Sequence, residues 1–150
     1  MPANLGKGGA VAAGLQFAHG EYLLILDADL GPSIVQSQAL IAPIRTGDAD
    51  LSIARFTRTV AKGGGVGLVV GLARRAISRA GGPNCEAPLS GQRCVRKSAI
   101  NSLLPLDTGF GLEIGMTLDA IRAGLKIVEV DTTMSHRVTG RNLKGIMHRL

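Results

Sequence analysis

A short apolar run that ends in two carboxylates limits what this chain can fold into more than any other feature. Residues 22–26, YLLIL, follow Gly20 and lead directly into Asp27-Ala28-Asp29. A short, continuous apolar run of this kind is typical of a strand buried on both faces of a parallel sheet. Because side chains alternate along a strand, Asp27 and Asp29 are expected on the same side of its carboxyl end, where α/β sheets bind ligands. Two close carboxylates repel each other unless a cation joins them.

Strand and helix patterns alternate along the rest of the chain. We expect strands over 22–26, 49–54, part of 90–100 and 126–131, and helices over 7–18, 33–44, 66–77 and 111–125. Ser33 followed by Gln36 forms a capping-box start for the second helix. The alternation predicts one α/β domain with a mostly parallel sheet flanked by helices. No strand precedes the first helix, so we expect an incomplete sheet with an exposed edge, which favours association.

The amino-acid composition indicates which kinds of molecule the protein binds. The chain has 150 residues, a formal net charge of +6 and a pI near 10.0, which favour anionic partners such as phosphates. One Tyr, three Phe and no Trp are too few for a single-stranded nucleic-acid platform, so we expect no nucleic-acid partner. Cys85 and Cys94 lack the spacing of a metal site and are expected to be reduced, which predicts a cytoplasmic protein. The longest apolar stretch is too short to span a membrane.

Two motifs in the first part of the chain are candidates for binding a nucleotide diphosphate. Gly6-Lys7-Gly8 would bring phosphates close to the amides of a helix start, with Lys7 as a point charge. The motif lacks the standard phosphate-loop spacing, and a glycine-rich helix start is the simpler interpretation. Asp27 and Asp29 suit a divalent cation that carries a diphosphate, because hard cations bind carboxylate and phosphate oxygens. The alternative is a surface turn with ordinary acidic residues.

Further candidates lie in the second half of the chain. Ser90, Gly91, Gln92 and Arg93 offer hydroxyl, amide and guanidinium donors in one turn. Glu113 is a candidate general base or a ligand for a sugar hydroxyl, although a glutamate in a first helical turn is also explained by the helix dipole. Each assignment therefore depends on what surrounds the residue in the fold.

Basic residues form the remaining candidates. His136 could add one metal ligand and Arg137 could bind phosphate, with a solvated basic loop as the alternative. The cluster of Arg74, Arg75 and Arg79 is a solvated helix face or a membrane-surface contact.

The order of these motifs is more specific than any one of them. It runs Asn4-Leu5-Gly6-Lys7-Gly8, Asp27-Ala28-Asp29, Leu89-Ser90-Gly91-Gln92-Arg93, Gly109-Phe110-Gly111-Leu112-Glu113, His136-Arg137. This order resembles the family-2 type glycosyltransferases of GT-A fold, above all the branch that contains the glucosyl-3-phosphoglycerate synthases. The polyprenyl-phosphate glycosyltransferases are similar more loosely.

The resemblance implies a role for each motif. Gly6, Lys7 and Gly8 would contact the donor nucleotide, and Asp27 would hold ribose or water. Asp29 and His136 would coordinate Mg²⁺ or Mn²⁺ on the donor diphosphate, with Arg137 beside the phosphates. The turn formed by Ser90, Gly91 and Gln92 would line the sugar and acceptor pocket, and Glu113 would contact the donor sugar or act as the base.

The implied function is a metal-dependent, inverting transfer of a sugar from a nucleotide-diphosphate donor to a small phosphorylated acceptor. Residues 58–65, which carry Arg58, Lys62 and three glycines, are a candidate anion-binding loop for that acceptor. A lipid phosphate, with peripheral membrane contact, is the alternative acceptor. Two other hypotheses are a nucleotidyltransferase and an inactive fragment. Members of the family begin with further βα units that carry the nucleobase pocket, so a partial GT-A domain is expected here.

Overall fold

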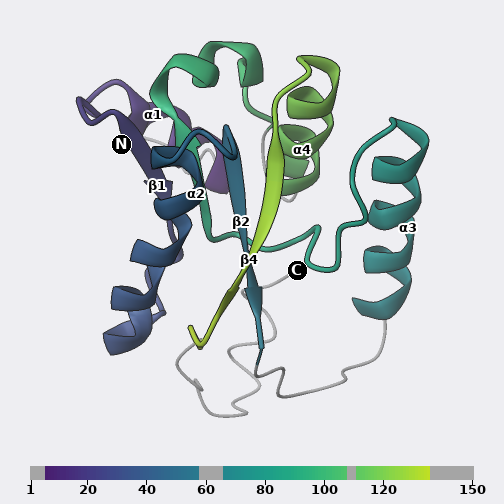
Figure 1. Cartoon of the computed structure of the whole chain (residues 1–150), viewed down its shortest axis with the longest axis horizontal. Coiled ribbons are helices and arrows are strands. Elements are labelled where there is room, and N and C mark those ends of the chain that lie inside the picture. Colours follow the sequence, from purple (N-terminus) through teal and green to yellow (C-terminus); the bar gives the residue numbers. More distant parts are fainter. Residues whose placement is uncertain (1–5, 58–65, 108–110, 136–150) are drawn as a thin grey trace.

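Four strands form one mixed sheet in the part of the chain that the computed structural model describes, which is residues 6–57, 66–107 and 111–135 (Figure 1). The strands are β1 (Tyr22–Ile25), β2 (Leu51–Phe56), β3 (Arg93–Arg96) and β4 (Ile127–Thr132), and their order is β1-β3-β2-β4. β3 is antiparallel to both β1 and β2, whereas β2 and β4 are parallel. Three of the four strands thus run in one direction, as predicted, and β3 makes the sheet mixed because it runs against both of its neighbours.

This topology brings the ends of several strands together at one end of the sheet, which we call its carboxyl edge. β1, β2 and β4 share one direction and β3 runs against it, so the carboxyl ends of three strands lie beside the amino end of the fourth. The pairing register shows this arrangement: Arg93 at the start of β3 pairs with Ile25 at the end of β1 and with Ile53 in β2. Residues that follow β1, follow β2 or precede β3 are thereby placed close together.

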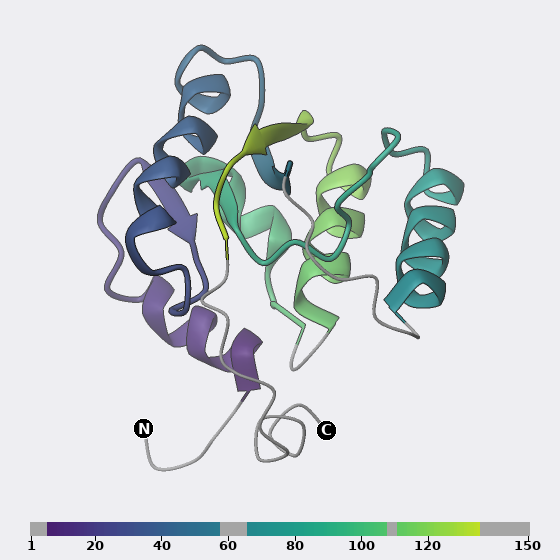
Figure 2. The same ribbon diagram turned by 90° about the horizontal axis from the view of Figure 1, so that it is seen from below.

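Helices cover both faces of the sheet, which confirms the α/β prediction. They are α1 (Gly6–Leu15), η1 (Gly31–Leu40), α2 (Ala42–Arg45), α3 (Val66–Arg79), η2 (Lys97–Leu103) and α4 (Leu112–Arg122). Figure 1 and Figure 2 show η1 and α2 on one side of the strands and α4 on the other, with α3 at the outer side of α4.

The helix expected over 33–44 is a 3₁₀ helix followed by one short α-helical turn. The capping box does not form, because η1 begins at Gly31 and the hydroxyl of Ser33 donates to the carbonyl of Leu30 instead. Pro43, which has no amide proton to donate, lies at the start of α2 and marks the break between the two pieces.

Two apolar clusters fix the sheet between its helices. The first joins the inner side chains of β1, β2 and β3 to η2 and α4, through Leu51, Ile53, Leu103, Leu112 and Met116 among others. The second lies on the opposite face and joins Leu40 and Ile44 of the η1–α2 segment to Ala54 and Cys94. The buried face of α4 consists of Leu112, Gly115, Met116, Thr117 and Ala120. The apolar stripe predicted from Ile114 and Leu118 is therefore rotated from the face that is buried.

β1 is the edge strand of the described sheet. Leu23 and Ile25 are buried, but the side chain of Leu24 between them is exposed. The prediction of a strand buried on both faces was therefore wrong at Leu24, whose side chain lies on the face of β1 opposite to that of Leu23 and Ile25. No described strand pairs with the outer side of β1. Within the described residues, no helix has both the length and the apolar character of a membrane span.

Candidate active site

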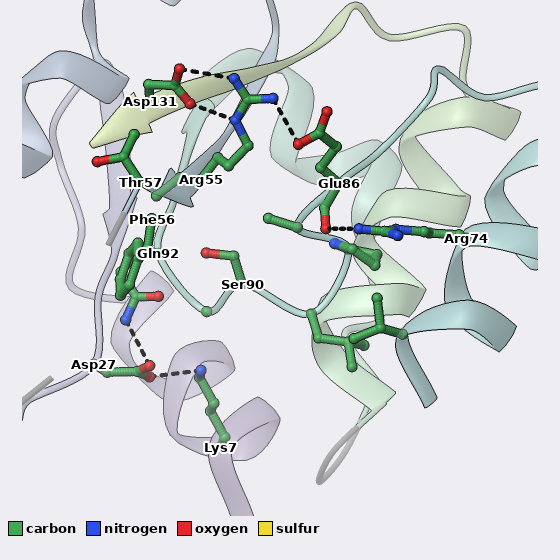
Figure 3. Close-up of a pocket in the computed structure, with 16 residues that line it drawn as sticks. Lys7, Asp27, Arg55, Phe56, Thr57, Arg74, Glu86, Ser90, Gln92 and Asp131 are labelled. Carbon is green, nitrogen blue, oxygen red and sulfur yellow. Dashed lines mark hydrogen bonds and ion pairs between the residues drawn. The ribbon is translucent and has the colours of Figure 1, made fainter. Parts of the chain in front are cut away.

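Four side chains from distant parts of the chain meet at the edge where β1 ends. Lys7 lies in the first turn of α1, Asp27 follows β1, Gln92 precedes β3 and Glu113 lies in the first turn of α4. The ammonium of Lys7 is 2.7 Å from Asp27 Oδ1 and 2.7 Å from Glu113 Oε1. The amide of Gln92 donates to Asp27 Oδ2 at 2.7 Å (Figure 3). One cation thus joins two carboxylates, and both oxygens of Asp27 are engaged.

Burial and pairing act in opposite directions on Lys7. Burial of the ammonium lowers its pKa, but the hydrogen bonds and charges of Asp27 and Glu113 outweigh burial, so the pKa of Lys7 is raised above its ordinary value. Glu113 is the most enclosed of the three, with 12% of its side chain exposed. Lys7 therefore stays charged through the physiological pH range, at a site shielded from solvent on one side.

Gly91 has to be a glycine for this cluster to form. A Cβ atom on Gly91 would collide with the Nζ of Lys7 and would lie 2.9 Å from Asp27 Oδ2. The backbone of the turn that contains Ser90, Gly91 and Gln92 can approach the cluster only without a side chain at this position.

A cavity of about 640 Å³ opens from the cluster across the carboxyl edge of the sheet. Lys7 and Asp27 line one end, and Arg55, Glu86 and Asp131 line the other (Figure 3). Arg55 bonds Asp131 through Nε and Nη2, at 2.5 and 2.8 Å, and lies 3.0 Å from Glu86 through Nη1. This end of the cavity therefore carries a cation that is already paired.

Ser90 presents an unsatisfied hydroxyl to the cavity. Its Oγ is buried and has no hydrogen-bond partner among the described residues, and Figure 3 shows it pointing between the two ends. A buried hydroxyl without a partner costs free energy unless a ligand or water bonds to it. The position thus suits a polar ligand such as a sugar or a hydroxy acid.

The loop that carries Ser90 is held by two charged side chains, the half-buried Glu129 and the buried Arg93, whose roles the sequence did not predict. Glu129 of β4 accepts hydrogen bonds from the amides of Glu86 and Ala87, at 2.9 and 2.6 Å, and from the thiol of Cys85. Arg93 was expected to offer its guanidinium to the site, but that group is buried and turned away from it. No local pattern marks Glu129, because its ligands lie more than 40 residues away.

Arg93 fixes the other end of the same loop. Its guanidinium donates to the carbonyls of Ser90 and Pro88 and to Thr117 of α4, and burial lowers its pKa to about 10. Arg74 of α3 donates to the carbonyls of Cys85 and Glu86. Three elements thereby hold the backbone of residues 85–91, which agrees with a loop that has to keep one shape.

The predicted metal site combines Asp29, which the structure describes, with His136, which lies outside the described residues. Asp29 follows Asp27 at the same edge and is exposed, and carboxylate oxygens suit Mg²⁺ or Mn²⁺. Asp29 stays the carboxylate that is predicted to hold the ion. His136 and Arg137 lie outside the described residues. Among the described residues no three His, Cys, Asp or Glu side chains converge, so the metal site stays a prediction.

The phosphate-binding prediction for the first motif also stays open. Gly6 begins α1, and Gly8 is its buried residue, so the motif is a glycine-rich helix start. The same helix start places Lys7 in contact with Asp27 and Glu113. Gly6, Lys7 and Gly8 are therefore placed beside Asp27, where the predicted donor site lies.

Comparisons with known proteins agree with the fold and the motifs. The family model of glycosyl transferase family 2 matches residues 1–103. Glucosyl-3-phosphoglycerate synthase of Mycobacterium tuberculosis is 29% identical over 143 residues, which cover 85% of this chain and 44% of that protein. The enzyme of Mycobacterium bovis gives the same values.

Solved structures of the Mycobacterium tuberculosis enzyme superpose on the chain. The complex with phosphoglyceric acid has a TM-score of 0.72 at 28% identity and covers 97% of this chain and 51% of that one. The complex with Mn²⁺, uridine diphosphate and glucosyl-3-phosphoglycerate has a TM-score of 0.71 at 28% identity, covering 98% and 52%. The chain spans about half the length of these relatives. With a family model that matches more than half of its length, the chain belongs to glycosyltransferase family 2.

Proposed function

We propose that this chain carries the catalytic part of a glycosyltransferase that moves a sugar from a nucleotide-diphosphate donor to a small phosphorylated acceptor. The observation that carries the proposal is the cluster of Lys7, Asp27, Gln92 and Glu113 at the carboxyl edge of the sheet. In this cluster Lys7 would bind the diphosphate, Asp27 would hold the ribose or a water molecule beside it, and Glu113 would contact the sugar. Similarity to an enzyme solved with uridine diphosphate and with phosphoglyceric acid supports both substrate classes.

The reaction would proceed by direct displacement with inversion. The acceptor oxygen forms a bond to the anomeric carbon as the bond from that carbon to the diphosphate oxygen breaks. The ammonium of Lys7 would stabilise the negative charge that develops on the leaving diphosphate. Glu113, which is more buried than Lys7, would accept the proton of the acceptor hydroxyl. Ser90 would orient the sugar or acceptor through its hydroxyl.

A divalent ion fits the donor set that this edge offers. When bound, Mg²⁺ or Mn²⁺ would neutralise diphosphate charge, and Asp29 with His136 would hold it. In this proposal Asp27 remains hydrogen-bonded to Gln92 and contacts the nucleotide, while Asp29 binds the ion.

Product analysis tests the reaction class. The chain is incubated with UDP-glucose, Mn²⁺ and 3-phosphoglycerate, and phosphorus NMR identifies the phosphate product. Release of uridine diphosphate together with a glucosylated acceptor supports the proposal. In a parallel incubation with UTP and glucose 1-phosphate, release of pyrophosphate would indicate a nucleotidyltransferase. No product in either incubation, from a folded chain that binds the donor, would indicate an inactive fragment.

Self-association remains a second expectation. The outer side of β1 has no described partner strand, and the exposed Leu24 lines a groove between β1 and α1. We propose that this edge pairs with another strand, from a second copy or from elsewhere, since unpaired strand edges favour such contacts. Light scattering of the purified chain over a concentration series measures whether a second copy is used.

A further inference from the structure

Helix α3 carries an exposed face that the proposed reaction does not use. Leu68, Leu72, Arg75 and Arg79 follow one another at intervals of four, three and four residues, so they lie on one side of the helix. The side chains of Leu68 and Leu72 are 73% and 56% exposed, and Val69 beside them is 52% exposed. The opposite side carries Ala73 and Ile77, which are buried.

Packing on that opposite side, together with the hydrogen bonds from Arg74 to the carbonyls of Cys85 and Glu86, anchors the helix. Ile77 of α3 and Ile121 of α4 both approach Gly82, where an added Cβ would collide with their side chains. Figure 1 and Figure 2 show α3 at the rim of the molecule, with α4 between it and the sheet. The leucine face is thus directed away from the described core.

Charge is distributed unevenly along this face. The first half of the face is apolar and the second half carries two arginines, and the helix contains no acidic residue. Leu68 and Arg75 are about 10 Å apart along the helix axis, since each residue rises about 1.5 Å. A helix tilted with its first half downward would bury the leucines below the phosphate level of a bilayer and leave the arginines at that level.

We propose that α3 docks this protein on a membrane surface that contains anionic lipid. Charge complementarity selects this occupant, because Arg75 and Arg79 suit lipid phosphates and the whole chain carries a formal net charge of +6. A second copy fits less well, because a symmetric contact of two α3 faces would bring four arginines into one interface without an acidic residue from α3.

The candidate active site lies behind the docking face, on the other side of α3. Val70 and Arg74 of the same helix line the cavity that contains Lys7 and Asp27. A docked chain would therefore hold that cavity close to the lipid headgroups. This consequence rests on the proposed function, and it would bring the alternative acceptor, a lipid phosphate, close to the cavity.

Vesicle sedimentation tests the docking face. The full chain is mixed with phosphatidylcholine vesicles with and without about 30% phosphatidylglycerol, at roughly 0.1 and 0.5 M salt. We expect sedimentation with the anionic vesicles only, weakened at high salt. The double variant Leu68→Ser/Leu72→Ser and the double variant Arg75→Gln/Arg79→Gln should each lower the partition coefficient roughly tenfold.

Matched controls separate docking from general effects. Phe17→Ser removes another exposed apolar side chain, and Arg45→Gln/Lys97→Gln removes two exposed charges elsewhere on the molecule. Both controls should bind vesicles like the parent chain. One result would show that binding depends on net charge alone and would overturn the proposal. In that result, vesicle binding falls equally in Arg45→Gln/Lys97→Gln and in Arg75→Gln/Arg79→Gln and does not fall in the leucine variant.

Two further results would also overturn it. The first is no sedimentation of a folded parent chain with either vesicle. The second is an oligomer that the leucine variant converts to a monomer without any vesicle binding, which would assign the face to a second copy. The leucine variant should keep the thermal shift with a nucleotide sugar, so a failure of docking and a failure of donor binding are distinguishable.

Discussion

The ammonium of Lys7 lies 2.7 Å from Glu113 Oε1, although 106 residues separate the two in the sequence. The same ammonium bonds Asp27, so a single lysine joins the first helix, the end of β1 and the start of α4. Nothing in the apolar core requires a cation at this point. A charge held between two carboxylates at the carboxyl edge of the sheet is better explained by the anionic donor that we propose for this edge.

Removal of that charge should weaken donor binding. In Lys7→Met, Asp27 and Glu113 face each other without a cation and would repel both one another and a diphosphate. We expect the dissociation constant for UDP-glucose, measured by calorimetry with Mn²⁺, to rise at least about tenfold. The control is Lys126→Met, because Lys126 is exposed and its ammonium contacts only the carbonyl of Gly47, at 3.4 Å, among the described residues. Equal affinities in both variants would exclude Lys7 from the donor site.

A single methyl group at Gly91 should have a similar effect through geometry. In Gly91→Ala the new Cβ collides with Lys7 Nζ, so the lysine must leave Asp27 or the turn must move. We expect a weaker donor affinity and a lower melting temperature. Gly14→Ala is the matched control, because nothing lies within 4 Å of its added Cβ and alanine favours the helix. If both variants bind the donor like the parent chain, the close approach of Gly91 has no functional role.

Loss of a buried guanidinium should destabilise the loop that carries Ser90. Arg93→Met leaves the carbonyls of Pro88 and Ser90 without their donor, at an expected cost of roughly 3 kcal/mol in the free energy of unfolding. Glu129→Gln should act more locally and speed hydrogen exchange at the amides of Glu86 and Ala87. Urea denaturation and hydrogen exchange measure the two effects. Unchanged exchange at both amides in Glu129→Gln would contradict the role given to Glu129.

Two buried thiols predict how stability depends on pH. Burial, with the hydrogen bond to Glu129, raises the pKa of Cys85 to about 12, and burial raises that of Cys94 to about 11, from an ordinary 9.0. Above pH 9 the unfolded thiols lose protons that the folded thiols keep, so the unfolded state binds fewer protons and stability falls as the pH rises.

The expected slope is up to about 1.4 kcal/mol per pH unit for each thiol between pH 9 and its folded pKa, and full stability is present below pH 9. Melting temperatures from pH 7 to 11 should therefore fall less steeply for Cys85→Ala than for the parent chain, and least for the double variant with Cys94→Ala. Parallel curves for all three proteins would show that neither thiol is linked to folding in this way.

The metal prediction concerns a residue at the surface. Asp29→Ala should abolish the Mn²⁺-dependent part of donor binding while changing the melting temperature without ligand very little, because Asp29 is exposed. His136→Ala should behave in the same way. Glu21→Ala, an exposed acid just before β1, is the control. Donor binding that is independent of Mn²⁺ in the parent chain would remove the need for Asp29 as a ligand.

Local sequence patterns predicted the elements and part of the site. The run over 22–26 predicted that Asp27 follows the carboxyl end of a strand, and that position is confirmed. There Asp27 contacts Lys7 and Gln92. The position of β3 between β1 and β2 was missed, because strand order depends on pairing between segments far apart in the chain. Glu129 and the inward turn of Arg93 were missed for the same reason. An apolar pattern indicates burial, but it does not indicate which partner a buried charge will meet.

The most direct test of the account is a thermal-shift titration of the chain with UDP-glucose and with GDP-mannose, each with and without Mn²⁺, for the parent and for Lys7→Met. A ligand that binds only the folded state must raise the melting temperature. The account predicts a rise for one nucleotide sugar in the parent chain with Mn²⁺ and a much smaller rise in Lys7→Met. A cooperative melt that no nucleotide sugar shifts, or an equal shift in both proteins, would contradict the claim that the Lys7 cluster binds the donor diphosphate.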